Sequence, residues 1–445
     1  MRKLFFIKTH IYPFIDDIFS FIIYFLLDGV LKKKNKTIMC LKDEEDKIND
    51  RIEEQLKRDK KLARKDLKIL LLGTGESGKS TFTKQMFIIH RKGFTPAMLN
   101  EHRPYVFHNT ITIMQQLLKH MIHYEISLSK PENNKHAQLI SSFDINYENA
   151  HKIFGRNTAL SPEVVTAIKQ LWLDDGVQWV YAKRTEFELS DSAEYFFTKV
   201  ERFGNSSYIP DNEDMLRVRL PTAGIQEHIF DMKKKIKLRI MDVGGQRGER
   251  KIWINCFECV QSVIFLAAMN EYDSFMIENR QMVRRMSVSL DLFKVILSVQ
   301  LLAKASMILF LNKRDLFDEK LPTSPLSRTF PEYDGNDNDN EAAADFIRQL
   351  FLDRASLCDS DDTIDNQSMN RNNSTRNMIM SQKKNSLTQM RSAVMIQAEK
   401  NKKIPRQIYP HYTTAINTKN IENIFASIKH TIIQKHINEV IPGLF

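Results

Sequence analysis

The segment GTGESGKST, residues 73–81, contains the residues whose types and spacing most clearly indicate a chemistry. It fills every position of the phosphate-binding pattern G-x-x-x-x-G-K-[ST]. Glycines in such a loop let backbone N–H groups close on phosphate oxygens, because a Cβ there would clash or favour the wrong φ. Lys79 would supply a positive charge for the β- and γ-phosphates, and the hydroxyl of Ser80 suits a Mg²⁺ ion. We therefore predict phosphate contacts from these residues: Gly75, Glu76, Ser77, Gly78, Lys79, Ser80 and Thr81.

The residues that flank this loop favour the elements that would position it. An apolar run at 68–72 predicts a strand that ends at the loop, and residues 80–90 predict a helix that begins there. The positive N-terminal end of that helix would face the bound phosphate. A chance match within a glycine-rich loop is the alternative, but it does not account for the strand and helix patterns on either side.

Three further motifs follow strand-like runs downstream. The run 236–241 precedes DVGG at 242–245, the run 307–311 precedes NKRD at 312–315, and the run 407–412 precedes TTA at 413–415. Asp242 could hold a metal-bound water, and the glycines after it, Gly244 and Gly245, could offer an amide to a terminal phosphate. Taken alone each motif is a weak signal, since charged turns after strands are common.

The NKRD motif indicates which base is bound. The carboxylate of Asp315 can accept hydrogen bonds from the N1–H and the exocyclic amine of guanine, and adenine lacks this pair of donors. Asn312 and Lys313 belong to the same motif, and Ala415 could bring a backbone N–H to the guanine carbonyl. In this order after a complete phosphate loop, the motifs predict a guanine-nucleotide switch. They argue against a kinase or ATPase that uses adenine nucleotides.

The order GTGESGKST, DMLRVRLPTAGI, DVGGQR, NKRD and TTA resembles that of the alpha subunits of heterotrimeric G proteins. The resemblance extends from about residue 43 to the C-terminus with one insertion, and the C-terminal tail is most similar to the inhibitory (Gi/o-like) class. It is specific, because small monomeric GTPases lack the long segment between the first helix and the motif around Arg219. The resemblance implies an α/β fold, with a Ras-like P-loop GTPase domain and an inserted all-α helical domain.

The resemblance also implies catalytic roles, which follow the mechanism established for this family. Arg219 would be the arginine finger that stabilises charge in the transition state, and Gln246 would orient the attacking water. Thr222 would join Ser80 as a hydroxyl ligand of Mg²⁺, and Asp242 would act on the ion through water. Further nucleotide contacts are expected from Leu216, Arg217 and Val218.

Two other contacts near the nucleotide, GTP or GDP, follow from the resemblance. Glu76 would pair with Arg219 when the γ-phosphate is absent. Asp191 and Ser192 resemble the edge of the helical domain that closes over the nucleotide, and a helix N-cap is an alternative role for this pair.

The composition is ordinary for a globular protein of two domains, with 445 residues, 27% charged and 42% hydrophobic. The formal net charge is +10. No zinc pattern, aromatic stacking motif or recognition helix indicates nucleic acid, so we assign this charge to a membrane-facing surface. The four cysteines form no disulfide framework and fit the reducing cytosol. Cys256 and Cys259 form a single C-x-x-C pair, and the lack of a second pair argues against a metal site.

The chain divides into several predicted segments. They are an apolar and basic extension at 1–38, an amphipathic helix at 39–65, a GTPase domain at 66–94 and 206–445, a helical domain at 95–205, and a disordered insertion within the GTPase domain at 358–403. The uncharged core of the extension, residues 18–27, is too short for a spanning helix. We expect a non-native upstream extension with Met39 as the functional start, and a membrane-interfacial anchor is the alternative.

The resemblance implies a Gβγ dimer, a G-protein coupled receptor and the membrane surface as partners. The helix would meet Gβγ through one apolar stripe, Ile48, Ile52 and Leu56. The other half of that interface would be formed by Arg247, Arg250, Lys251, Ile252 and Trp253. The tail 440–445 would bind the receptor, and Pro442 stands where pertussis-toxin substrates have cysteine, so we predict no such ADP-ribosylation. Cys40 lies where relatives commonly carry palmitate, which predicts the cytoplasmic face of the plasma membrane.

A non-cycling scaffold that binds Gβγ and receptor with negligible hydrolysis is the alternative function. The presence of Arg219 and Gln246 argues against it. The insertion 358–403 and Pro221 leave it open, and both Pro221 and Gly248 depart from the family pattern. Pro221 fixes φ and removes a donor in a segment that must rearrange.

Overall fold

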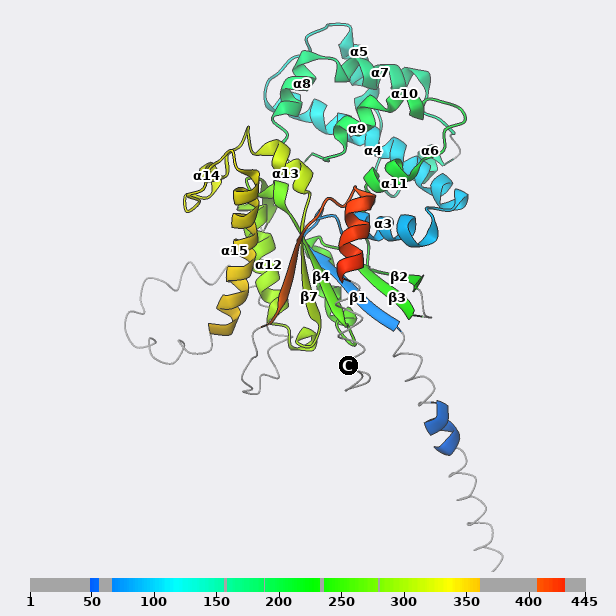
Figure 1. Cartoon of the computed structure of the whole chain (residues 1–445). Helices are drawn as coiled ribbons and strands as arrows, with labels where there is room; N and C mark the ends of the chain where they lie inside the picture. Colours follow the sequence, from blue (N-terminus) through cyan, green and yellow to red (C-terminus); the bar gives the residue numbers. More distant parts are fainter. Residues whose placement is uncertain are drawn as a thin grey trace, which may run out of the picture. The chain divides into compact units, whose positions relative to one another are not determined.

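The computed structural model describes residues 49–55, 66–155, 158–187, 189–232, 236–278, 281–360 and 406–428 (Figure 1). Several predicted features lie outside these residues: the extension 1–38, Cys40, most of the insertion 358–403, and the receptor-binding tail. The chain divides into two compact units, residues 1–66 and 67–445. In the first unit, residues 49–55 form a helix on which Ile52 is exposed, while Ile48 and Leu56 lie outside the described residues.

The second unit is built on a six-stranded sheet in the order β2-β3-β1-β4-β7-β8. The strands are β1 (Asp66–Gly73), β2 (Ile225–Met232), β3 (Ile236–Val243), β4 (Ser262–Ala268), β7 (Ser306–Asn312) and β8 (Ile408–Tyr412). The β1–β4, β4–β7 and β7–β8 pairs are parallel, and the edge strand β2 pairs antiparallel with its neighbour β3. Every residue of β4 and β7 is buried, as expected for parallel strands that are covered on both faces.

Alternate side chains of β1 enter two different hydrophobic cores, because successive residues of a strand point to opposite faces. Leu70 and Leu72 join the core beneath α12 (Arg285–Leu297) and α15 (Asn340–Ser360). Ile69 and Leu71 join the core beneath α3 (Lys79–Arg91) and the helix at 418–428. Figure 1 shows these two pairs of helices on the two faces of the sheet.

The segment between α3 and Arg219 folds as helices around a third hydrophobic core. The helices are α4 (Pro96–His123), α5 (Asn133–Ser141), α6 (Ala150–Phe154), α7 (Pro162–Trp172), α8 (Asp175–Ala182), α9 (Ala193–Thr198), α10 (Val200–Phe203) and α11 (Asn212–Arg217). The longest, α4, begins with Thr95 as its N-cap, whose side chain accepts a hydrogen bond from the Met98 N–H. Tyr208 and Val218 also pack in this core, so the helical domain continues beyond the predicted boundary at residue 205.

Asp174 divides the apolar run 164–181 into two helices. Its carboxylate accepts hydrogen bonds from the Ser129 N–H at 3.0 Å and the Asn133 Nδ2 at 2.8 Å. It also caps α8 by accepting from the Gly176 N–H at 2.9 Å. A side chain that serves as an N-cap starts a new helix, so α7 and α8 are separate.

The remaining described elements are short. They are η2 (Arg247–Cys256), η3 (Met269–Glu271), β5 (Phe275–Glu278), β6 (Gln281–Arg284), η4 (Gln300–Leu302), α13 (Arg314–Lys320) and α14 (Leu326–Thr329). The segment that follows the DVGG motif is the 3₁₀ helix η2, which ends at Cys256. The helix α15 runs on to Ser360, into the first residues assigned to the insertion. In the described part of the chain, no helix is both long and apolar enough to cross a membrane.

Candidate nucleotide site

The phosphate loop lies between β1 and α3, as the sequence pattern predicted. Gly78 adopts φ 101°, and a Cβ at this position would lie 2.2 Å from Nδ2 of Asn312, so only glycine fits. The ammonium group of Lys79 donates to the carbonyl oxygens of Gly73 at 3.1 Å and Thr74 at 2.7 Å. Burial lowers the pKa of Lys79 to about 8, and the negative charge of Asp242 partly opposes this shift. A buried lysine in such a loop is suited to meet an anion.

One cavity of about 230 Å³ opens at the carboxyl ends of β1 and β7. All of the predicted nucleotide contacts line it except Ser77, Asp242 and Gly244. The hydroxyl of Ser77 turns back to donate to the carbonyl of Thr74 at 3.0 Å. The cavity therefore brings together residues that are far apart in the sequence, as ligand sites at the carboxyl edge of parallel sheets do.

Sequence reasoning missed several lining residues, among them Lys84, Ser190, Leu316 and Ile416. Each lies next to a recognised motif or one helical turn away from it. Their proximity to a motif was the only signal, because none of them belongs to a motif itself.

The residues predicted to hold Mg²⁺ form an all-oxygen donor set. The hydroxyl oxygens of Ser80 and Thr222 lie 2.7 Å apart, although the two residues come from separate segments. Asp242 is buried, and within the described structure its Oδ1 has no hydrogen-bond partner. Burial raises the pKa of Asp242, while a hydrogen bond from Ser80 and the charge of Lys79 oppose that rise. Hydroxyl and carboxylate oxygens are the ligands that Mg²⁺ prefers, so these residues fit the ion.

Asn312 is a buried side chain that joins three segments of the site. Its Nδ2 donates to the carbonyl of Ser77 at 2.8 Å, and its Oδ1 accepts from the Thr413 hydroxyl and the Ala415 N–H, both at 3.0 Å. In this structure the Ala415 N–H, which we predicted to reach the guanine carbonyl, donates to Asn312, and its contact with the base stays a prediction. Asp315, in the first turn of α13, lines the cavity and is exposed.

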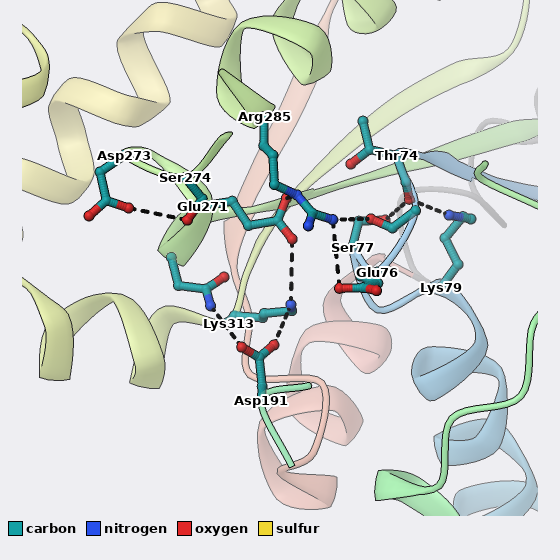
Figure 2. Close-up of polar contacts among 12 residues, drawn as sticks. Thr74, Glu76, Ser77, Lys79, Asp191, Glu271, Asp273, Ser274, Arg285 and Lys313 are labelled. Atoms are coloured by element: carbon teal, nitrogen blue, oxygen red, sulfur yellow. Dashed lines mark hydrogen bonds and ion pairs between the residues drawn. The ribbon is translucent and has the colours of Figure 1, made fainter. Parts of the chain in front are cut away.

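A chain of charged side chains connects the phosphate loop with the helical domain (Figure 2). Glu76 pairs with Arg219, as expected, and lies 3.6 Å from Arg285. Glu271 bridges Arg285 at 3.1 Å and Lys313 at 3.7 Å. Arg285 and Glu271 were not predicted, because they follow no motif and come together only through the fold of η3 and α12.

Asp191 ends this chain of charges, since Lys313 donates to its Oδ2 at 2.5 Å. Although burial disfavours the ionised form, the charge of Lys313 lowers the pKa of Asp191. Ser192 occupies the N-cap position of α9, but its side chain makes no capping hydrogen bond. The alternative role of this pair as an N-cap is therefore not supported, and Asp191 is instead a contact between the helical domain and the NKRD loop.

A protein-family model described as G-protein alpha subunit matches residues 46–432. The chain belongs to the G-protein alpha subunit family. Membership supports guanine-nucleotide-binding signal transduction and, in general, partnership with Gβγ dimers and receptors. It also agrees with the observed fold, a Ras-like domain with a parallel-rich sheet and an inserted helical domain.

Two side chains of the switch segment of this alpha subunit hold its own glycines in place. The indole of Trp253 donates to the carbonyl of Gly244 at 2.8 Å, and Arg250 donates through Nε to the carbonyl of Gly245 at 3.2 Å. Both side chains are buried, which corrects their assignment to an exposed Gβγ-binding surface. Gln246, by contrast, is exposed and lines the cavity.

Proposed function

We propose that this alpha subunit is a GTPase switch, which hydrolyses GTP to GDP and phosphate and is reset by receptor-catalysed exchange. One observation carries this proposal: Arg219 and Gln246, from separate segments, line the same cavity as Lys79 of the phosphate loop. A non-cycling scaffold would not need a cation and an amide at the same phosphate site.

Each group has a role that follows from its position. Lys79 binds the β- and γ-phosphates, and the Asp315 carboxylate selects guanine. Gln246 orients the attacking water, and the Arg219 guanidinium leaves Glu76 to stabilise charge on the transferring phosphoryl group. Mg²⁺, held by Ser80 and Thr222 with Asp242 acting through water, supplies neutralisation of phosphate charge when bound.

Single-turnover hydrolysis of GTP and of ATP tests this proposal. We expect turnover of GTP alone, with a loss of roughly 10³-fold or more in Arg219→Cys and a comparable loss in Gln246→Leu. Both variants should bind GTP as the wild type does. Tight GTP binding without turnover by the wild type would favour the scaffold. Pro221 and Gly248 would then be the first residues to test as the cause of the missing hydrolysis.

We further propose coupling to receptors in the manner of the Gi/o-like class, and a location on the cytoplasmic face of the plasma membrane with Cys40 palmitoylated. The resemblance of the C-terminal tail and the basic net charge of +10 support these assignments. Loss of membrane association in Cys40→Ser, measured by cell fractionation, is the expected outcome.

A further inference from the structure

Arg219 is held through its backbone as well as through its side chain. The guanidinium group pairs with Glu76, and the side chain is 36% exposed. The backbone N–H of Arg219 donates to Oδ1 of Asn109 at 2.6 Å, and Nδ2 of Asn109 donates to the carbonyl of Arg219 at 3.0 Å. One amide side chain therefore satisfies both backbone groups of the residue that carries the proposed arginine finger.

Asn109 is itself rigidly placed on α4 of the helical domain. It is 3% exposed, and its helix neighbours Phe107 and Ile111 are fully buried in the helical core. Its Nδ2 also lies 3.3 Å from Nδ1 of His108. Burial lowers the pKa of His108 to about 4, so the imidazole is neutral at neutral pH and this nitrogen can accept a hydrogen bond. His108 is covered in turn by the ring of Tyr147, at a centroid distance of 4.3 Å.

The residue before Arg219 is held from two sides. The side chain of Val218 packs in the helical core. Its carbonyl accepts a hydrogen bond at 2.7 Å from the ammonium group of Lys84, which lies on α3 directly after the phosphate loop. The backbone that precedes the guanidinium is thus tied to the helical domain through Asn109 and to the phosphate loop through Lys84.

We propose that Asn109 is a positioning residue for GTP hydrolysis. It holds the backbone of Arg219, so that the guanidinium can move from Glu76 to the phosphoryl group by side-chain rotation alone. Such an arrangement confines the finger to a productive position, and a displacement of about 1 Å at such a site can lower a rate by about 10²-fold. This inference rests on the proposed function, because it assigns the helical domain a part in the same reaction.

The test compares Asn109→Ala with Asn133→Ala in the full chain. Asn133 is a matched control, since it is also buried in the helical domain and donates to Asp174 at 2.8 Å, away from the cavity. We expect Asn109→Ala to lower single-turnover GTP hydrolysis by about 10- to 100-fold. Affinity for a non-hydrolysable GTP analogue should change by less than about threefold. Asn133→Ala should lower the unfolding temperature and leave the hydrolysis rate within about twofold.

The decisive measurement repeats Asn109→Ala in the Arg219→Ala background. If Asn109 acts through Arg219, its removal should have no further effect once the finger is gone. An equal loss in both backgrounds would mean a general structural role and would overturn the inference. Asn109→Asp keeps the acceptor for the Arg219 N–H and loses the donor, so we expect an intermediate rate. Asn109→Asp also tests the positioning role of Asn109 if Asn109→Ala does not fold.

Failure of the inference and failure of the proposed function give different results. If Arg219→Ala is slow and Asn109→Ala hydrolyses GTP at the wild-type rate, only the positioning role is wrong. If Arg219→Ala itself hydrolyses at the wild-type rate, the proposed catalytic role of Arg219 is wrong.

Discussion

Glycine at position 245 lets the switch segment touch the phosphate loop. A Cβ at Gly245 would lie 2.2 Å from Nζ of Lys79 and 2.5 Å from the carbonyl oxygen of Thr74. No side chain can be accommodated there unless one of the two segments moves. The missing side chain therefore sets how closely the switch segment can approach a terminal phosphate.

Replacement of Gly245 by alanine should weaken binding of a GTP analogue more than binding of GDP. Overpacking by one methyl group costs about 1–3 kcal/mol, which corresponds to roughly 5- to 150-fold in affinity. Gly248→Ala is the matched control, because a Cβ at Gly248 meets nothing within 4 Å. Equilibrium titration with both nucleotides measures the effect. Equal weakening of GDP and GTP-analogue binding would contradict the predicted γ-phosphate contact.

Selection of the base also depends on a single residue. Replacement of Asp315 by asparagine should shift preference from guanine towards xanthine nucleotides, because a carboxylate acceptor becomes partly a donor. Glu319→Gln, one turn later on α13 and also exposed, is the control. Competition between GDP and XDP for the site provides the measurement. Unchanged guanine selectivity in Asp315→Asn would remove the base-binding role from this residue.

Among the helices and strands, those next to the motifs could be predicted from the sequence, and the points at which a helix is interrupted could not. The runs at 68–72 and 307–311 are β1 and β7, since a continuous apolar run is typical of a strand buried on both faces. The division of α7 from α8 depends on what the Asp174 carboxylate contacts, which periodicity does not contain. The hydrogen bond from Ala415 to Asn312 likewise depends on the meeting of two distant loops.

The contacts of Asp174 make the stability of the helical domain sensitive to acid. Burial disfavours its carboxylate, but hydrogen bonds from Ser129, Asn133 and Gly176 lower its pKa overall. A carboxyl group whose folded pKa is below its unfolded value stabilises the fold above the unfolded pKa, about 3.9, and loses this effect as pH falls through the folded pKa. Asp174→Asn should therefore lower the unfolding temperature most at neutral pH.

The difference in unfolding temperature between the wild type and Asp174→Asn should shrink once the pH falls below about 4. Thermal unfolding across this pH range measures it. Asp175→Asn, at the exposed neighbouring carboxylate, should behave as the wild type does. A difference that is independent of pH would show that the charge of Asp174 does not contribute.

In the molecule as a whole, the ion pair of Asp191 with Lys313 joins the helical domain to the NKRD loop. The Asp191 side chain is 39% exposed, so the pair should contribute only about 0.2–1 kcal/mol. A contact of this size slows separation of the two domains modestly and does not prevent it.

Removal of this pair in Asp191→Ala should speed GDP release by about two- to fivefold at low salt. The increase should become smaller at high ionic strength, because salt screens exposed charges. Glu201→Gln, which breaks an exposed ion pair with Lys169 inside the helical domain, should leave release unchanged. Dissociation of labelled GDP over a range of salt concentrations measures these rates. An effect that does not depend on salt would contradict an electrostatic origin.

The chain passes from the helical core at Val218 to the proposed metal ligand at Thr222, with Arg219 between them. The connection between the two domains is thus part of the proposed catalytic site. If the helical domain moves away to release nucleotide, either the hydrogen bonds between Asn109 and Arg219 break or Arg219 moves with the helical domain. In both cases the finger is lost while the site is open. Exchange and hydrolysis then exclude one another in time, and a newly bound GTP is safe from cleavage until the domains have closed.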